Sequence, residues 1–204
     1  ETLTQLPHPP KTLICASAIG YYGDRGADLL NESAAPGKGF LADLCREWEA
    51  AADLAREKGM RVVNLRIGVV LSPKGGGLAA MLTPFKLGGG GVMGSGHQYW
   101  SWIALDDVIG AIHHCLMNDR LSGPVNVTSP TPVTNYEFTK TLGKVLHRPT
   151  IVPMPAFAAR LALGEMADEL LLSSSRVMPN RLSESGYVFR LPTLEGALRH
   201  LLGT

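Results

Sequence analysis

Two short apolar runs stand out in the hydrophobic pattern of the first third of the chain. Residues 13–19 (LICASAI) lie between a proline-rich segment and Gly20, and residues 61–67 (RVVNLRI) are rich in β-branched side chains. Apolar runs of this length, without regular alternation, are typical of strands that are buried on both faces of a sheet. The sequence therefore predicts two buried strands.

Between these runs, apolar residues recur at helical spacing. The pattern predicts a helix that starts near Phe40 and ends at Gly59, where glycine is favoured after a helix. Its expected apolar face comprises Phe40, Leu41, Leu44, Cys45, Trp48, Ala51, Ala52 and Ala55. A strand, a helix and a strand in this order form a βαβ unit, so we expect the two strands to be parallel.

Further elements follow along the chain. The pattern predicts helices over residues 78–87, from Asp106, from a capping box at residues 134–137, and from Pro192. It also predicts short strands over 99–104 and 124–127, and helices over 156–163 and 165–172. Asp106 and Asp107 are interpreted as acidic residues that satisfy the helix start, in preference to a catalytic carboxylate pair.

The glycine-rich segment at residues 88–96 contains a match to GxGxxG, at Gly89, Gly91 and Gly94. This fingerprint binds a dinucleotide only when it follows a strand and opens a helix. Here a predicted helix precedes it, so we reject the match.

Composition narrows the classes of function. The 204 residues carry a formal net charge of +1, which argues against nucleic-acid or anionic-membrane partners, and 45% are hydrophobic, enough for a sizeable core. No apolar run is long enough to span a bilayer, and no signal peptide opens the chain. Three cysteines without a CxxC or HExxH motif predict free buried thiols, a cytoplasmic location and no metal site.

The start of the chain is polar and proline-rich and leads directly into a buried strand. A parallel strand of this kind needs neighbours on both sides. We therefore expect the chain to be the carboxyl-terminal part of a longer protein.

Several motifs, in one order, resemble the extended short-chain dehydrogenase/reductase superfamily, and most closely its epimerase-like, YfcH-type branch. They are SAIGYYGD at residues 17–24, CREWEA at 45–50, LRIGVVL at 65–71, GSGHQYW at 94–100, WIALDD at 102–107 and PVNVTSP at 124–130. The resemblance runs from about Lys11 to the end of the chain.

The resemblance implies an α/β fold: the carboxyl-terminal part of a Rossmann-type, doubly wound parallel sheet with a small helical substrate subdomain. The expected division is a partial Rossmann-type domain at residues 1–147, with an excursion at 72–104 toward the substrate side, and a mainly helical subdomain at 148–204. The amino-terminal glycine fingerprint of such a domain would lie outside this sequence.

The resemblance also implies NADP as the cofactor. It places Ser17, Ala18, Gly68 and Val69 beside the cofactor, with Gly68 and Val69 in the turn that passes the nicotinamide. Ser17 and Tyr22 are the candidate catalytic residues, because they supply a hydroxyl and a phenol from the same turn. The alternative for Ser17 is a hydroxyl bonded to a nearby backbone group, and for Arg66 it is a structural role in a buried strand.

The chain departs from the superfamily at its Tyr-x-x-x-Lys pair, because Phe40 and Leu44 stand at those two positions. In the superfamily the Tyr transfers a proton and the Lys lowers its pKa, since an unperturbed phenol titrates near pH 10. Arg46 lies about 200° around the helix from the Lys position and cannot simply replace it.

Two classes of function therefore remain open, each with a small molecule as partner. The first is an NADP(H)-dependent oxidoreductase or epimerase-type enzyme, and the second is a non-catalytic nucleotide-binding or regulatory protein. A third hypothesis, a structural module that forms a homodimer through its sheet edge, is less favoured.

Overall fold

The computed structural model of the chain describes residues 2–157 and 172–204. Its central sheet has three parallel strands in the order β1 (Thr12–Ala18), β3 (Arg61–Ile67) and β7 (Gly123–Val127). The register pairs Ser17 of β1 with Arg66 of β3, so the carboxyl ends of these two strands lie together. This confirms the two predicted strands, their parallel pairing and the α/β fold class. Burial is confirmed for β3 only, because β1 stands at an edge of the three-stranded sheet and its residues are partly buried or exposed.

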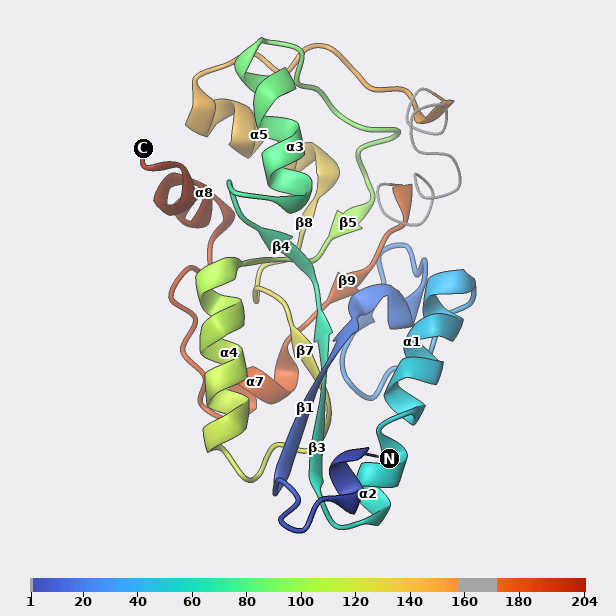
Figure 1. Cartoon of the computed structure of the whole chain (residues 1–204). Coiled ribbons are helices and arrows are strands. Elements are labelled where there is room, and N and C mark those ends of the chain that lie inside the picture. Colours follow the sequence, from blue (N-terminus) through green and yellow to red (C-terminus); the bar gives the residue numbers. More distant parts are fainter. Residues whose placement is uncertain (1, 158–171) are drawn as a thin grey trace.

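Helices cover both faces of this sheet (Figure 1). α1 (Phe40–Ala50) and α2 (Asp53–Glu57) lie on one face, and α4 (Leu105–Met117) lies on the other. The first face is packed around Val62 with alanines of the α1–α2 segment, and the second is packed around Val63, Leu65 and Ala111. Alternation along β3 thus sends successive side chains into two separate cores.

A second group of elements lies beyond the carboxyl ends of the central strands, at the top of Figure 1. β4 (Val69–Leu71) pairs in parallel with β6 (Trp102–Ala104), and β5 (Tyr99–Trp100) pairs antiparallel with β8 (Val133–Thr134). Around them pack α3 (Gly76–Lys86), α5 (Asn135–Leu146) and α8 (Leu194–Leu202), with Trp102 and Phe138 at the centre of a third core.

Residues 176–184 lie beside the central sheet. β9 (Arg176–Val177) pairs in parallel with β2 (Leu29–Leu30), and α7 (Asn180–Glu184) packs against β7. Among the described residues, 3-10 helices form at η1 (Thr2–Gln5) and η2 (Ile19–Tyr22). The helices predicted over 156–163 and 165–172 fall almost entirely outside the described residues. In the described part of the chain, no helix has the length and apolar character needed to cross a membrane.

The helix predicted from Phe40 to Gly59 differs from the structure in extent and in orientation. It is divided into α1 and α2 by a turn at residues 51–52. The predicted apolar face is only partly right: Cys45 is buried, whereas Phe40 and Trp48 are 71% and 57% exposed. The inward face of α1 instead carries Glu49, which is anchored to the sheet by Arg66 and so fixes the rotation of the helix.

Other local predictions are confirmed or refined. The capping box that begins α5 has both of its hydrogen bonds, between Thr134 and Glu137. The predicted strand over 99–104 consists of two strands with different partners, β5 and β6. The glycine-rich segment follows α3 and opens no helix, which supports rejection of the fingerprint.

Asp106 and Asp107 have structural partners, but not the predicted ones. Asp107 is 1% exposed and accepts hydrogen bonds from the Tyr187 hydroxyl and from the backbone N–H groups of Arg190 and Leu191. Asp106 pairs with His200. The two carboxylates therefore hold the carboxyl-terminal segment against α4 rather than only satisfying the start of their own helix.

Candidate functional site

A pocket of about 270 Å³ opens where the carboxyl ends of β1 and β3 meet the second group of elements. Its walls combine apolar side chains and backbone from η2, α1, the β3–β4 turn and β5 with hydroxyl groups. The lining residues are Ala18, Ile19, Gly20, Gly23, Leu41, Cys45, Ile67, Gly68, Val69, Tyr99, Trp100, Ser101, Ser173 and Ser175. The carboxyl ends of parallel strands are where open α/β sheets bind ligands.

Three of the four predicted cofactor-binding residues, Ala18, Gly68 and Val69, line this pocket. Ala18 ends β1 and Gly68 follows β3 directly, so the parallel register brings them together. The structure does not place Ser17 in the lining.

Gly68 occupies a position that excludes any side chain. A Cβ there would clash with the carbonyl oxygen of Ser101 and would lie 2.9 Å from Cγ2 of Thr128. The backbone N–H of Gly68 donates to Val127, and that of Val69 donates to Ser101. Gly68 therefore lets the turn pack closely against Ser101 and Thr128, and the backbone hydrogen bonds join the turn to the strands beside it.

Ser17 lies outside the pocket lining and its hydroxyl is engaged. It donates a hydrogen bond of 2.8 Å to Oε1 of Glu49. That carboxylate in turn accepts two 2.8 Å hydrogen bonds from Nε and Nη2 of Arg66. The partner of Ser17 is thus a side chain on α1, not the nearby backbone group that the sequence suggested as its alternative.

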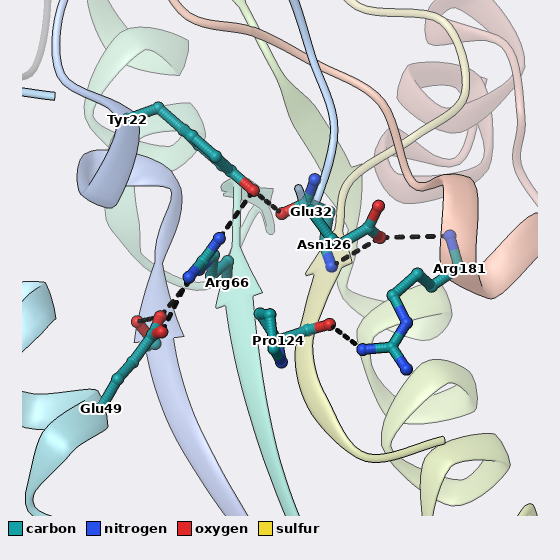
Figure 2. A network of polar contacts seen from close by, with 8 residues as sticks. Tyr22, Glu32, Glu49, Arg66, Pro124, Asn126 and Arg181 are labelled. Atoms are coloured by element: carbon teal, nitrogen blue, oxygen red, sulfur yellow. Dashed lines mark hydrogen bonds and ion pairs between the residues drawn. The ribbon is translucent and has the colours of Figure 1, made fainter. Parts of the chain in front are cut away.

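Tyr22 is fully buried in the same network, which Figure 2 shows. Its hydroxyl donates to Oδ1 of Asn126 at 2.7 Å and accepts from Nη1 of Arg66 at 3.0 Å. Burial raises the pKa of the Tyr22 phenol, which makes it a weaker acid. The phenol therefore points toward Asn126 of β7 and Arg66 of β3, and Tyr22 is not among the residues that line the pocket.

Arg66 is the centre of this network. Burial acts to lower its pKa, but the hydrogen bonds with Glu49 and Tyr22 outweigh burial and raise the pKa. The guanidinium carbon also lies 3.4 Å from the ring centre of Tyr21. These contacts bear out the structural alternative for Arg66, because its donors are committed within the protein.

The network continues through Glu32, which is 9% exposed. Its Oε1 accepts the backbone N–H groups of Asn126 and Arg181 at 3.1 and 3.2 Å. Burial raises the pKa of this carboxyl. Figure 2 shows how the chain of contacts runs from Glu49 to Arg181 across β3 and β7.

Phe40 and Leu44, at the positions of the superfamily's Tyr and Lys, do not line the pocket. Leu44 is 38% exposed, and Phe40 is largely exposed. Their neighbours Leu41 and Cys45 point into the pocket instead. Within the described residues, α1 therefore contributes apolar side chains and a thiol to the pocket wall, and no proton-transfer pair.

Sequence reasoning missed the part of the lining that comes from later in the chain. Ser175 donates through its hydroxyl to the carbonyl of Gly23 at 2.7 Å, and Ser101 donates to the carbonyl of Ser175 at 2.7 Å. The backbone N–H of Tyr99 donates to Ser174. Three consecutive serines at 173–175 were the available signal, since hydroxyls in a row commonly bond to backbone.

Comparison with known proteins identifies relatives along nearly the whole chain. Residues 154–201 match a family described as "Domain of unknown function (DUF1731)". The chain is 48% identical over 187 residues to epimerase family protein Mb2239 of Mycobacterium bovis, covering 92% of this chain and 62% of that protein. It is 35% identical to epimerase family protein SDR39U1 of Homo sapiens, covering 99% of this chain and 69% of that protein.

Solved structures agree with this relationship. The human epimerase family protein SDR39U1 (isoform 2), solved with NADPH, matches with a TM-score of 0.93 and 35% identity over 99% of this chain and 68% of that one. A nucleoside-diphosphate sugar epimerase from Corynebacterium glutamicum matches with a TM-score of 0.78 and 36% identity, covering 98% of this chain and 39% of that one. Thermus thermophilus UDP-glucose 4-epimerase, 22% identical with a TM-score of 0.70, covers 95% of this chain and 65% of that one and shares the Rossmann-type fold.

The chain spans about three-fifths of the length of its mycobacterial relative, at 62%. Its motifs, its parallel sheet and its identity to the human protein over 69% of that protein's length agree with one another. The chain therefore belongs to the epimerase family proteins, an atypical branch of the extended short-chain dehydrogenase/reductases.

Proposed function

We propose that the protein binds NADP(H), with the nicotinamide end in the pocket formed by Ala18, Gly68 and Val69. The observation that carries the proposal is the convergence of these residues at the carboxyl ends of two adjacent parallel strands. The human relative was solved with NADPH, which agrees with this choice of dinucleotide. The pocket would then lie at the redox-active end of the cofactor.

The lining suits a flat, weakly polar ring. Ile19, Leu41 and Val69 provide apolar walls, and Gly68 brings backbone close to the pocket. Among the described residues that line the pocket, none carries a formal charge, so they offer no partner for the cofactor's phosphates. We therefore expect the 204-residue chain to bind the dinucleotide weakly and a longer protein that includes the glycine fingerprint to bind it tightly.

The reaction that we propose is redox or epimerase-type chemistry on a small molecule. When bound, NADP(H) supplies or accepts a hydride. The contribution of this chain would be to hold the substrate beside the ring and to exclude water with the walls from Ile19, Leu41 and Trp100. Ser17 and Tyr22 stay predictions for the proton-transfer step.

The test is fluorescence or calorimetric titration of the full-length protein with NADPH and NADH. Saturable binding of NADPH, weakened by Gly68→Val, is the expected result. Absence of binding of either dinucleotide at millimolar concentration would refute the proposal.

A non-catalytic, nucleotide-binding role is the second candidate. It is favoured by the engagement of the Ser17 and Tyr22 hydroxyls in the Arg66 network and by the exposure of Phe40. Hydride transfer from NADPH to any member of a panel of carbonyl compounds, lost in Ser17→Ala, would exclude this candidate. Binding of NADPH without any transfer would support it.

A further inference from the structure

One arginine beside the pocket is held by an aromatic ring but has no acidic partner among the described residues. Arg176, in β9, is partly buried, and its guanidinium carbon lies 4.7 Å from the ring centre of Tyr99. Its Nε is buried without a hydrogen-bond partner. A buried N–H without an acceptor is costly in a folded protein, so such a donor calls for an explanation, and a bound ion is one of the common ones.

The other buried or partly buried arginines in the described segments are used differently. Arg66 is paired with Glu49 in two hydrogen bonds. Arg61 and Arg181 donate to backbone carbonyl groups. Among the described residues, none forms a hydrogen bond or ion pair with the guanidinium of Arg176, although stacking on an aromatic ring orients it.

The position of Arg176 relates it to the pocket. Tyr99, on which it stacks, lines the pocket, and so do Ser173 and Ser175, which lie directly before β9. The lining residues that the structure describes bear no formal charge. A molecule that occupies the pocket and extends past Tyr99 would therefore reach the guanidinium of Arg176.

We propose that Arg176 recognises an anionic oxygen group, a carboxylate or a phosphoryl group, on the substrate of this pocket. A planar guanidinium presents its donors as a fork that matches the oxygens of such groups, and charge-assisted hydrogen bonds are among the strongest in proteins. The substrate class is then a small acid or phosphorylated compound whose other end lies in the uncharged pocket. The assignment of the anion to a substrate depends on the proposed function, whereas the anion site itself does not.

The test is NMR of the arginine Nε–Hε groups in the ¹⁵N-labelled chain, without cofactor, during titration with succinate, inorganic phosphate or chloride. The resonance of Arg176 is assigned by its loss in Arg176→Lys. We expect it to shift saturably with succinate or phosphate and not with chloride. The anion that saturates at the lower concentration identifies the group as carboxylate or phosphoryl.

Two variants with the same change of charge complete the experiment. Arg176→Gln should weaken anion binding by about tenfold or more, equivalent to ~1.4 kcal/mol. Arg120→Gln, at an exposed position after α4, should bind as the unaltered chain does. A resonance that does not shift saturably, or equal affinity in Arg176→Gln, would overturn the proposal.

The same variants separate this inference from the proposed function. Anion binding that persists in a protein unable to bind NADPH would leave the anion site standing and refute the cofactor proposal. In full-length protein, Arg176→Gln should leave NADPH affinity unchanged. A tenfold or larger loss of NADPH affinity would assign Arg176 to the dinucleotide and overturn its role toward a substrate.

Discussion

Glu49 and Arg66 form a two-hydrogen-bond ion pair that joins α1 to the centre of the sheet. Both contacts are 2.8 Å, and the side chains are 12% and 4% exposed. Ser17 also donates a hydrogen bond to Glu49, and Arg66 donates one to the hydroxyl of Tyr22. Because both charges are largely removed from water, the loss of either one would leave the other buried without a counter-charge.

We predict that Glu49→Gln destabilises the protein strongly, because it leaves the buried Arg66 charge without a counter-charge. The expected loss is about 3–5 kcal/mol in the free energy of unfolding, measured by urea denaturation. Asp43→Asn is the matched control on α1, since Asp43 forms an exposed pair with Arg46. That control should cost less than about 1 kcal/mol, and equal losses in the two variants would contradict the prediction.

A second prediction concerns Gly68. Gly68→Ala places a methyl group against the Ser101 carbonyl and Thr128, so we expect a loss of about 1–3 kcal/mol from overpacking. Gly75→Ala is the control, because a Cβ at Gly75 meets no atom within 4 Å. Chemical denaturation should give the control a change within about 0.5 kcal/mol. A Gly68→Ala protein as stable as the control would show that the turn can relax.

The third prediction concerns pH. Burial raises the pKa of Glu32 above its ordinary value of 4.5, so the folded state holds this proton more tightly than the unfolded state does. The stabilisation is complete below the unfolded pKa and is lost as pH rises through the folded pKa. Glu32→Gln keeps an acceptor oxygen and removes the titration.

The stability of Glu32→Gln relative to the unaltered protein should therefore increase as pH rises above 4.5 and then become constant. The measurement is the free energy of unfolding as a function of pH for both proteins. A difference that decreases with pH would indicate that the backbone donors of Asn126 and Arg181 favour the charged carboxylate more than burial opposes it.

The fourth prediction tests how the carboxyl-terminal segment is held. Asp107→Asn should cost more than about 2 kcal/mol, because the N–H groups of Arg190 and Leu191 donate to different oxygens of Asp107. An Asn side chain has one acceptor oxygen, so one of these two buried N–H groups would face an amide NH2 that cannot accept. Asp106→Asn carries the same change of charge at the next position, where the side chain is 40% exposed. Thermal or chemical unfolding should show a smaller loss of stability for Asp106→Asn than for Asp107→Asn. Equal losses of stability would count against the role of Asp107.

The fold could be predicted where sequence pattern and local chemistry agree. The runs at residues 13–19 and 61–67 have the length and apolar character of strands, and the helical pattern between them predicts that the two strands are parallel. The capping box at Thr134 depends on residues three apart and is therefore visible in sequence. The positions of Gly68 and Val69 followed from the family resemblance, and the structure places both residues in the pocket lining.

The polar contacts at the site could not be predicted in the same way. Ser17 and Glu49 are 32 residues apart, and Tyr22 and Asn126 are 104 apart, so their pairing depends on tertiary packing. The predicted face of α1 was partly wrong for the same reason. Hydrophobicity alone favours Phe40 and Trp48 as inward residues, whereas the ion pair of Glu49 turns them outward.

The hydrogen bond from Ser175 to Gly23 joins positions 152 residues apart at the rim of the pocket. A molecule that occupies this pocket therefore contacts both the early and the late parts of the chain at once. Because a ligand that binds only the folded form shifts the folding equilibrium by mass action, its arrival should raise the melting temperature of the chain as a whole. A thermal-shift screen of small metabolites thus becomes a direct route to the natural occupant.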